Sequence, residues 1–304
     1  MRVFVTGASG HVGSAVLPEL IGAGHSVIGL ARSDEAAAAV AASGAEVVRG
    51  TLEDLDTLKR TADEADGVIH LAFRHDAMHA GDLAGAAETD LAAVEAMASV
   101  LKGTGKPLVG TAGTAVLAVA NLGRVGLESD SLPGGYRIDT ENVIISLADQ
   151  GVRTSVVRLA PTVHSSLDKH GFVPALITFA RQHNKAAYLG DGANRWPAVH
   201  TFDAARLYRL ALESAPAGTR LHAAAEGGIP FRLIAETIGA NLGIPTVRLS
   251  EEQAPAYFTY LAPFVGIDNP TSSEFTRDLL GWTPTHPGLI ADMNEGHYFA
   301  ASLG

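Results

Sequence analysis

Three glycines near the start of the chain have the spacing of a nucleotide-binding turn. Gly7, Gly10 and Gly13 lie in VTGASGHVG, which follows the apolar run RVFVT and precedes an amphipathic helical pattern. In this arrangement the first glycine permits a tight turn, the second lets the backbone approach a pyrophosphate, and the third lets the helix pack against the sheet. The helix N-terminus then faces the phosphates. The residues predicted to contact a dinucleotide here, in preference to forming a purely structural turn, are Gly7, Ser9, Gly10, His11, Val12 and Gly13.

Arg32 is the residue that indicates which dinucleotide is bound. The residue that hydrogen-bonds the ribose 2′-hydroxyl of NAD is an Asp or Glu about 20 residues after the glycines. This chain has Arg32 there, in GLARSDE. A guanidinium can pair with a 2′-phosphate and stack on adenine. We therefore predict NADP(H), with NAD(H) as the weaker candidate. The alternative is a solvated surface arginine beside Asp34 and Glu35.

Short apolar runs alternate with helical patterns through the first 160 residues. This alternation is typical of βαβ units in a parallel sheet covered on both faces. The predicted strands are residues 2–6, 26–31, 46–48, 67–73, 106–111 and 154–160, and the predicted helices are 11–23, 35–42, 55–65, 82–101 and 137–149. We therefore predict an α/β fold, a Rossmann doubly wound parallel sheet with a smaller α+β C-terminal substrate lobe.

The pattern becomes irregular beyond Pro161. A turn is expected at residues 190–197, a helix at 203–213 with Asp203 as its N-cap, a second helix at 231–242, and a third that begins after Ser250. The predicted domain bounds are 1–165 and 197–215 for the NADP-binding domain, and 166–196 and 216–304 for the substrate-binding lobe.

The composition restricts the chemistry and the partners. The chain has 304 residues, of which 47% are hydrophobic and 18% charged, which is typical of a globular protein. It has no cysteine, which excludes disulfides and thiolate catalysis. A net charge of −11 without a Lys/Arg run disfavours nucleic acid and membrane surfaces as partners. We find no signal sequence and no apolar segment of about 20 residues, and therefore expect a cytoplasmic protein.

Six motifs spread along the chain can be read together: TGASGHVG, RGTLED, VIHLAF, RLAPTVH, GDGANRWPAVHTFDAA and LLGWTPTHPG. Taken together, they resemble the extended short-chain dehydrogenase/reductase family, in particular its nucleotide-sugar epimerase-like and 3β-hydroxysteroid dehydrogenase-like members. The resemblance extends over nearly the whole chain, and implies an NAD(P)-dependent oxidoreductase and a homodimer. The further cofactor contacts that it implies are Leu52, Leu71, Ala72, Phe73, Arg137, Pro161 and Val163.

The chain departs from this family at the catalytic residues. The family implies a Ser or Thr that orients the substrate oxygen, a Tyr that transfers its proton, and a Lys four residues later that holds the ribose. In this sequence Pro133 stands at the Tyr position, Arg137 at the Lys position and Gly113 at the Ser position. Arg137 can keep the hydrogen bonds and the charge of the lysine but cannot donate a proton near neutral pH.

The substrate proton must therefore come from another group. The candidates are Tyr136, which on a helix would point about 60–100° away from the expected direction, a water held by Thr111 or Thr114, and a histidine of the second lobe. His164 follows PTV, the stretch that in the family passes beside the nicotinamide, although a structural hydrogen bond is the commoner role for a lone histidine. The predicted catalytic residues are Thr111, Thr114, Tyr136 and Arg137.

Residues of two loops are candidates for contacting the substrate. His75 follows the fourth predicted strand, at the carboxyl edge of the sheet, and the alternative is a solvated loop. Arg195 and Trp196 offer anion capture and stacking, but Trp196 could equally belong to the core. The predicted substrate-binding residues are His75, His164, Arg195 and Trp196.

Other residues are assigned to structure. Trp282 is expected in the core, and core packing is preferred over a pocket for the aromatic face formed by Tyr257, Phe258, Tyr260 and Phe264. His70, His75 and His79 lack an accompanying acidic motif, so no metal site is predicted.

The function that these residues indicate is an NADP(H)-dependent reductase or dehydrogenase acting on a small carbonyl or alcohol substrate. The alternatives are an NADP-binding sensor without turnover, favoured by the missing Ser and Tyr, and a nucleotide-sugar epimerase or dehydratase.

Overall fold

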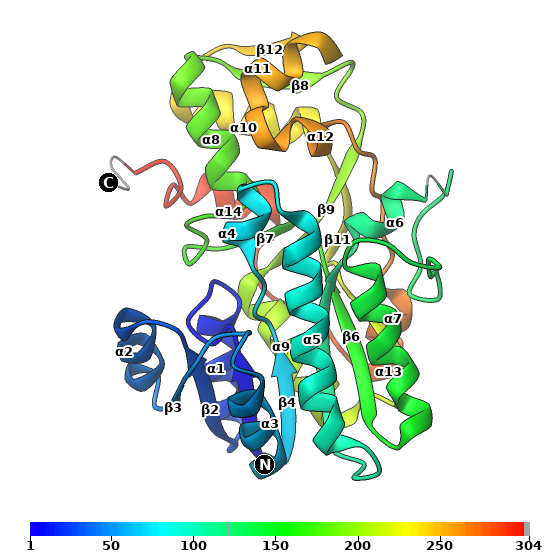
Figure 1. Cartoon of the computed structure of the whole chain (residues 1–304). Helices are drawn as coiled ribbons and strands as arrows, with labels where there is room; N and C mark the ends of the chain where they lie inside the picture. Colours follow the sequence, from blue (N-terminus) through cyan, green and yellow to red (C-terminus); the bar gives the residue numbers. More distant parts are fainter. Residues whose placement is uncertain (121, 301–304) are drawn as a thin grey trace.

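The apolar runs of the first 160 residues form most of a seven-stranded sheet in the computed structural model (Figure 1), which describes residues 1–120 and 122–300. Every strand pair in this sheet is parallel. The strands are β1 (Arg2–Thr6), β2 (Ser26–Ala31), β3 (Glu46–Arg49), β4 (Gly67–His70), β5 (Pro107–Gly113), β6 (Arg153–Leu159) and β10 (Thr219–Ala223).

The strand order of the sheet places a ligand crevice beside β1. The order is β10-β6-β5-β4-β1-β2-β3, so the chain proceeds outward in one direction to β3 and then in the other direction from β4. In register, Val3 of β1 lies between Val27 of β2 and Gly67 of β4. Helices therefore leave β1 and β4 on opposite faces, which opens a crevice at the carboxyl ends of these two strands. The glycine turn follows one of them directly, and Leu71 follows the other.

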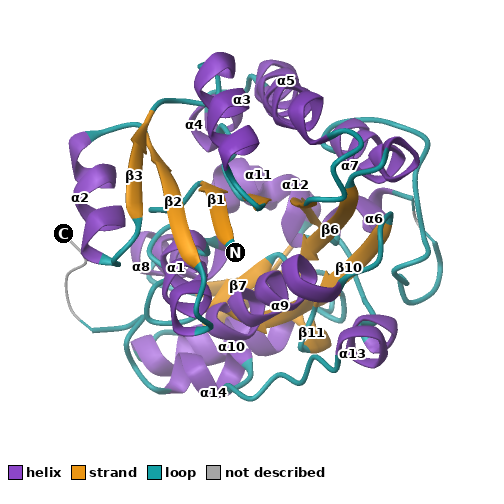
Figure 2. Cartoon of the chain, turned by 90° about the horizontal axis from the view of Figure 1, so that it is seen from below, coloured by secondary structure: helices purple, strands orange, loops and turns teal. Residues whose placement is uncertain are grey.

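Helices cover both faces of the sheet (Figure 2). On one face α1 packs against α9, and on the other α5 packs against both α3 and α7. Because side chains alternate along a strand, Val3 and Val5 are buried under α1 and α9, whereas Phe4 between them is buried under α3 and α5. The helices of this domain are α1 (Gly13–Gly22), α2 (Asp34–Ala42), α3 (Leu55–Glu64), α4 (His75–His79), α5 (Leu83–Leu101), α6 (Ala115–Val119), α7 (Ile138–Ser146), η1 (Leu147–Gln150), α9 (Thr201–Ser214) and α13 (Glu274–Leu280).

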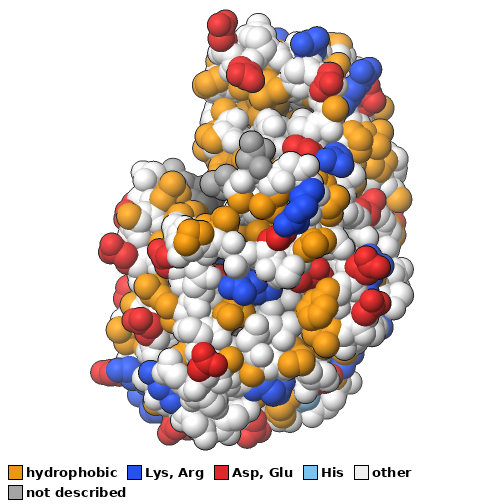
Figure 3. All heavy atoms as spheres, turned by 90° about the vertical axis from the view of Figure 1, so that its right-hand side faces the viewer, with side chains coloured by type: hydrophobic (Ala, Val, Ile, Leu, Met, Phe, Trp, Pro, Cys, Tyr) orange, Lys and Arg blue, Asp and Glu red, His pale blue; other side chains and the backbone are white. Residues whose placement is uncertain are grey.

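A smaller lobe with its own hydrophobic core lies above the carboxyl edge of the sheet. A hollow separates part of this lobe from the larger domain in Figure 3. Its strands are β7 (Thr162–His164), β8 (Ala186–Leu189), β9 (Arg195–His200), β11 (Glu226–Pro230) and β12 (Thr246–Leu249). Its helices are α8 (Phe172–His183), α10 (Phe231–Leu242), η2 (Glu251–Gln253), α11 (Ala254–Phe258), η3 (Thr259–Leu261), α12 (Ala262–Val265) and α14 (Leu289–Asn294).

The chain after Pro161 differs from the sequence prediction in three places. β10 lies in the seven-stranded sheet, so the larger domain extends past residue 215, where we expected it to end. β9 begins at Arg195, inside the expected turn at 190–197. His200 rather than Asp203 is the N-cap of α9, and its ring accepts the Phe202 amide at 3.4 Å. The helix at 231–242 and the cap at Ser250, which forms a capping box with Gln253, are confirmed.

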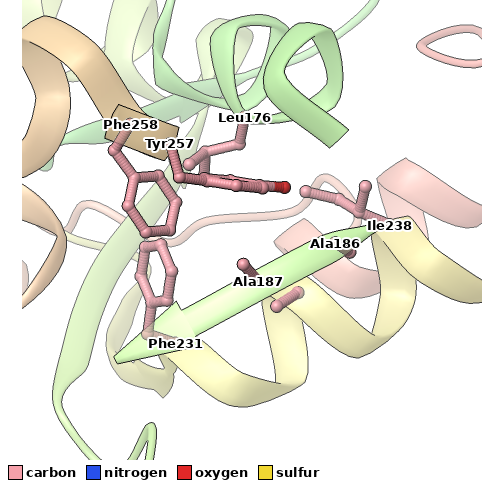
Figure 4. Close-up of a pocket in the computed structure, with 8 residues that line it drawn as sticks. Leu176, Ala186, Ala187, Phe231, Ile238, Tyr257 and Phe258 are labelled. Atoms are coloured by element: carbon pink, nitrogen blue, oxygen red, sulfur yellow. The ribbon is translucent and has the colours of Figure 1, made fainter. Parts of the chain in front are cut away.

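Two of the four aromatic residues expected in the core of the lobe lie there. Tyr257 and Phe258 are buried, and the cavity beside them has a volume of about 10 Å³, which is at the lower limit for one water molecule. Figure 4 shows their rings pointing toward Leu176, Phe231 and Ile238. Core packing is therefore confirmed for these two residues and wrong for Tyr260 and Phe264, which are exposed. None of the helices in the described ranges 1–120 and 122–300 combines the length and apolarity that crossing a bilayer would require.

Candidate active site

The glycine turn after β1 is closed so tightly that side chains are excluded from it. Gly7 has φ +66°, and a Cβ there would lie 2.7 Å from the Ala72 amide nitrogen of the loop after β4. A Cβ on Gly13 would lie 2.1 Å from the Gly7 carbonyl oxygen, and the Gly10 amide donates to that same oxygen at 3.0 Å. The turn thus presents backbone at the start of α1 and fits a dinucleotide pyrophosphate at the sheet crevice.

The side chain of His11 connects this turn with the second lobe. Its Nε2 lies 2.8 Å from Oγ1 of Thr201, at the start of α9, and its Nδ1 lies 3.8 Å from the carboxylate of Asp168. Burial and the neighbouring His164 and His200 lower the pKa of His11 to about 4. Any cofactor contact by His11 is therefore made by its backbone or by a neutral ring that is already engaged.

Two arginines at the ends of the neighbouring strands β2 and β3 have different environments. Arg32 is exposed and has no hydrogen bond or ion pair with any residue in the described part of the chain. Arg49 on β3, which the sequence did not single out, donates to the Ser33 carbonyl at 2.5 Å and to Asp34 at 2.8 Å. Arg32 is therefore an exposed cation directly after β2, whereas Arg49 fixes the loop beside it.

The loop after β4 brings an aromatic ring, that of Phe73, to the crevice. The guanidinium of Arg137 lies 4.1 Å above the ring of Phe73, within the range of a cation–π contact. Tyr136 meets the same ring edge-on at a centroid distance of 6.1 Å, and His75 does so at 5.2 Å. The ring of Phe73 thus brings together three residues that the sequence assigned separately to catalysis and to substrate binding.

Tyr136 and Arg137 precede α7 instead of lying on it. Arg137 is the N-cap, with φ 60° in the left-handed region, and α7 begins at Ile138. The helical direction expected for Tyr136 is therefore wrong, because the chain turns sharply just before the helix. Arg137 donates to the Thr111 carbonyl at 3.1 Å. Burial raises the pKa of Tyr136 above its ordinary value, although the charge of Arg137 opposes this shift.

Thr111 and Thr114 are engaged within the fold. The Thr111 hydroxyl donates to the His70 carbonyl at 2.7 Å and lies 2.8 Å from the Tyr208 hydroxyl. The Thr114 hydroxyl is buried and accepts from the Asn269 amide at 2.9 Å. The Thr111 hydroxyl thus connects β5 with α9, and the Thr114 hydroxyl connects the end of β5 with the loop before α13, so both are engaged within the fold.

His164 is likewise part of the interior. It is fully buried on β7, and its Nδ1 lies 2.8 Å from Oδ2 of Asp292 on α14. Its ring meets that of His200 edge-on at 5.4 Å. The geometry therefore corrects the expected contact with a substrate and bears out the structural alternative. Pro161 and Val163, the expected cofactor contacts beside it, are half-buried.

Arg195 and Trp196 have separate surroundings. Arg195 forms a two-pronged ion pair with Asp268, with Nε–Oδ1 at 3.0 Å and Nη2–Oδ2 at 2.8 Å. Trp196 is 2% exposed and packs between Phe172 and Phe231. The core alternative therefore holds for Trp196, and the charge of Arg195 is already paired. Trp282 is buried as expected.

The remaining predicted contacts lie near the crevice or in the core. Leu71, Ala72 and Phe73 follow β4 and are half-buried, whereas Leu52 is buried in the core under α3 and α5. Among the three histidines considered for a metal, the side chain of His79 lies outside the described residues, and His70 is bound to Thr6 and Asp90. Among the described residues, the group that could hold a metal ion is a different one, formed by Asp292, Glu295 and His297.

A doubly wound parallel sheet, a glycine turn at its switch point and an Arg–Tyr pair at its carboxyl edge define a dinucleotide-dependent enzyme of the extended short-chain dehydrogenase/reductase class. The model of the NAD dependent epimerase/dehydratase family matches residues 3–224, and the chain belongs to that family. It is therefore an NAD(P)-dependent enzyme of this type.

Relatives in two yeasts are similar over their full length. The chain is 47% identical to an uncharacterised protein of Schizosaccharomyces pombe, covering 98% of this chain and 100% of that protein. It is 45% identical to an uncharacterised protein of Saccharomyces cerevisiae, covering 98% and 99%.

Two further proteins are more distant. A 4-hydroxy-2-methyl-3-oxo-4-farnesyl-3,4-dihydroquinoline-1-oxide ketoreductase of Stigmatella aurantiaca is 28% identical, covering 84% of this chain and 79% of that protein. The solved structure of the dTDP-glucose 4,6-dehydratase DesIV of Streptomyces venezuelae, with NAD and TYD bound, has a TM-score of 0.78 at 19% identity, covering 98% and 96% of the two chains. At this low identity, the similarity to DesIV shows the fold alone.

Proposed function

We propose that the protein is an NADP(H)-dependent reductase or dehydrogenase that acts on a small carbonyl or alcohol substrate. The observation that carries this proposal is the placement of Tyr136 and Arg137 around Phe73, at the carboxyl edge of the sheet beside the glycine turn. The ketoreductase relative supports reduction of a ketone. The exposed and unpaired Arg32 supports the phosphorylated cofactor.

A bound nicotinamide would supply the hydride chemistry, and the residues of the chain would bind and orient both reactants. The amides at the start of α1 would hold the pyrophosphate. Arg137, whose charge is permanent, would hold the ribose. Tyr136 transfers the proton to the carbonyl oxygen during reduction and removes it from the alcohol during oxidation.

A panel of ketones and aldehydes, followed by the loss of NADPH absorbance, tests this function. We expect turnover of at least one carbonyl compound, and a kcat about 100-fold lower in Tyr136→Phe, because a positioned acid contributes factors of this order. Tyr188→Phe is the control, since Tyr188 lies in β8 under Arg232 and keeps its ring in the variant.

Two results would contradict parts of the proposal. An unchanged kcat in Tyr136→Phe removes Tyr136 as the acid. NADPH binding without turnover of any carbonyl compound or alcohol replaces the reductase by the alternative of a cofactor sensor.

A further inference from the structure

A buried tyrosine, Tyr298, lies in the segment that follows α14, residues 295–300. Its ring packs in the core of the smaller lobe, and the residue is 3% exposed. Its hydroxyl accepts the Ser165 amide at 3.1 Å and donates to Oδ2 of Asp168 at 3.1 Å. The Asp168 amide donates in turn to the Ser165 carbonyl at 3.0 Å. Tyr298 therefore holds both ends of the short turn that follows β7.

Ser165 continues this contact toward the larger domain. Its amide is bound by Tyr298, and its hydroxyl donates to Oγ1 of Thr201, the first residue of α9, at 2.8 Å. Ser165 is 1% exposed and Thr201 is fully buried. These hydrogen bonds lie away from solvent, where leaving a polar group unpaired is costly. Ser165 thus couples the position of Tyr298 to the start of α9.

The hydrogen-bond directions show that the path continues to the glycine turn. The Thr201 hydroxyl has one proton, which it donates to the His164 carbonyl at 3.1 Å. Oγ1 of Thr201 therefore accepts from His11, whose Nε2 lies 2.8 Å away and carries the ring proton. His11 lies inside the glycine turn. The connected path is called the Tyr298 network, and its members are Tyr298, Ser165, Thr201 and His11.

The glycine turn would hold the cofactor phosphates by its backbone amides. The affinity of such a site depends on how firmly its backbone is held before the ligand binds, because any ordering that binding must complete weakens it. The ring of His11 anchors the turn to α9 by a hydrogen bond. The hydroxyl of Tyr298 supports that anchor from the other lobe.

We propose that Tyr298 is a positioning residue of the cofactor site, which raises the affinity for the dinucleotide by holding the glycine turn through the Tyr298 network. This inference rests on the cofactor site of the proposed function. Coupling between two sites is reciprocal, so a bound dinucleotide also stabilises the docked position of residues 295–300. The smaller lobe thus responds to the occupancy of the cofactor site.

Two matched tyrosine variants test the proposal. Tyr298→Phe keeps the buried ring and removes the hydroxyl. We expect Kd for NADPH, measured by fluorescence, to rise about three- to tenfold, the factor that corresponds to one hydrogen bond. Tyr257→Phe is the control, because Tyr257 is also buried in the smaller lobe but donates to the Lys185 carbonyl instead of to the Tyr298 network. Weakening of NADPH by both variants alike, or by neither, overturns the proposal.

A double-mutant cycle shows whether the effect passes through Ser165. Ser165→Ala removes the donor to Thr201 and leaves the backbone amide that Tyr298 accepts. We expect this variant to weaken NADPH by a similar factor, and Tyr298→Phe to add little in its background. Additive effects contradict a shared path. When Tyr298→Phe does not fold, Ser165→Ala decides alone, and an unchanged Kd then overturns the proposal.

Hydrogen exchange tests the coupling in the reverse direction, in the unaltered protein. The amides of Phe299 and Ala300 donate to the Gly296 carbonyl, and saturation with NADPH should slow their exchange. Unchanged exchange of residues 295–300 on saturation contradicts the coupling.

The ring resonances of His11 give a readout without cofactor. They are identified by their loss in His11→Asn, and we expect them to shift in Tyr298→Phe and to stay in place in Tyr257→Phe. Unmoved resonances in Tyr298→Phe contradict the inference. A protein that binds neither NADPH nor NADH refutes the proposed function, and the His11 resonances then decide the role of Tyr298.

Discussion

Individual side chains at the reaction site are positioned by partners far away in the sequence. Arg137 is held by the ring of Phe73, from the loop after β4, and by the carbonyl of Thr111 in β5. A guanidinium presents a planar set of donors that a lysine lacks, and it can stack on a ring. This difference explains how the chain keeps a cation beside the proposed ribose site although the family's lysine is absent.

Arg32 should determine the choice of cofactor. An arginine–phosphate pair contributes about 1.5–3 kcal/mol, which corresponds to a factor of about 10–100 in affinity. We therefore expect Arg32→Ala to weaken NADPH by this factor and to leave NADH nearly unchanged, as measured by fluorescence titration.

Arg60→Ala on α3 is a suitable control for this prediction, since Arg60 is equally exposed and lies on a different element. Equal affinity of the unaltered protein for NADPH and NADH would remove the assignment of the phosphorylated cofactor.

The sequence was sufficient to predict the role of residues that depend on nearby backbone. It did not predict the role of residues whose interaction partners lie far away in the chain. Gly7 and Gly13 are required by contacts within one turn and its neighbouring loop, so their spacing was sufficient. Thr111 pairs with Tyr208 and His164 pairs with Asp292, which are 97 and 128 residues apart in the chain. No local pattern contains such partners.

At the scale of elements, the turn between β1 and α1 is held closely by backbone on two sides. Its backbone is in contact with the loop after β4 on one side and with its own carbonyls on the other. Alternating burial along β1 then fixes which face of the sheet α1 covers. The position of the first helix, and of the amides at its start, thus follows from the first 13 residues and from β4.

Gly13→Ala should disrupt this turn. The new Cβ would lie 2.1 Å from the Gly7 oxygen and 2.7 Å from the Ala8 oxygen, and both are backbone atoms. We expect the free energy of unfolding to fall by about 1–3 kcal/mol and NADPH to bind more weakly, as measured by urea unfolding and fluorescence.

Gly22→Ala provides the opposite control in the same helix. A Cβ at Gly22 meets nothing within 4 Å, so alanine should stabilise α1 by about 0.5–1 kcal/mol. Equal stability of the two variants would contradict the steric argument.

The strands of the larger domain were predictable because parallel strands buried on both faces form continuous apolar runs. β9 and β10 were not placed correctly, since their assignment depends on which sheet they join. β10 is positioned beside β6, where a buried ion pair of Arg158 with Glu141, extended by Arg220, connects β6 and β10 with α7. Such pairing is a property of the assembled fold.

At the scale of the whole molecule, buried titratable groups lie where the lobes meet. His200 and His11 have their pKa lowered to about 4, first by burial and then by neighbouring histidines, whereas burial raises the pKa of Asp168 to about 6. As the pH falls below about 6.5, each histidine becomes protonated in the unfolded chain before it does so in the folded protein, which lowers the stability. Asp168 becomes protonated at a higher pH in the folded protein than in the unfolded chain, which has the opposite effect. The two histidines therefore outweigh Asp168.

Stability should fall as the pH decreases from about 6.5 to 4. His200→Asn keeps an acceptor for the Phe202 amide and removes one of these groups, so the loss of unfolding free energy between pH 7.5 and 4.5 should shrink by up to about 3 kcal/mol. Urea unfolding at the two pH values measures this difference.

His170→Asn, at an exposed position, should retain the pH dependence of the unaltered protein. A His200→Asn variant with the same acid sensitivity as this control would show that His200 is not among the groups responsible.

The path of the chain between the two lobes has a further consequence. The backbone leaves the large sheet after β6, builds part of the lobe, returns for α9 and β10, and then leaves again. A fragment that ends after β6 would lack the edge strand β10 and the helix α9, which covers one face of the sheet. A fragment that begins after β6 would contain α9 and β10 but not the sheet against which they pack. We therefore expect neither piece to fold by itself, and the larger domain to become stable only after residues 201–223 have been made.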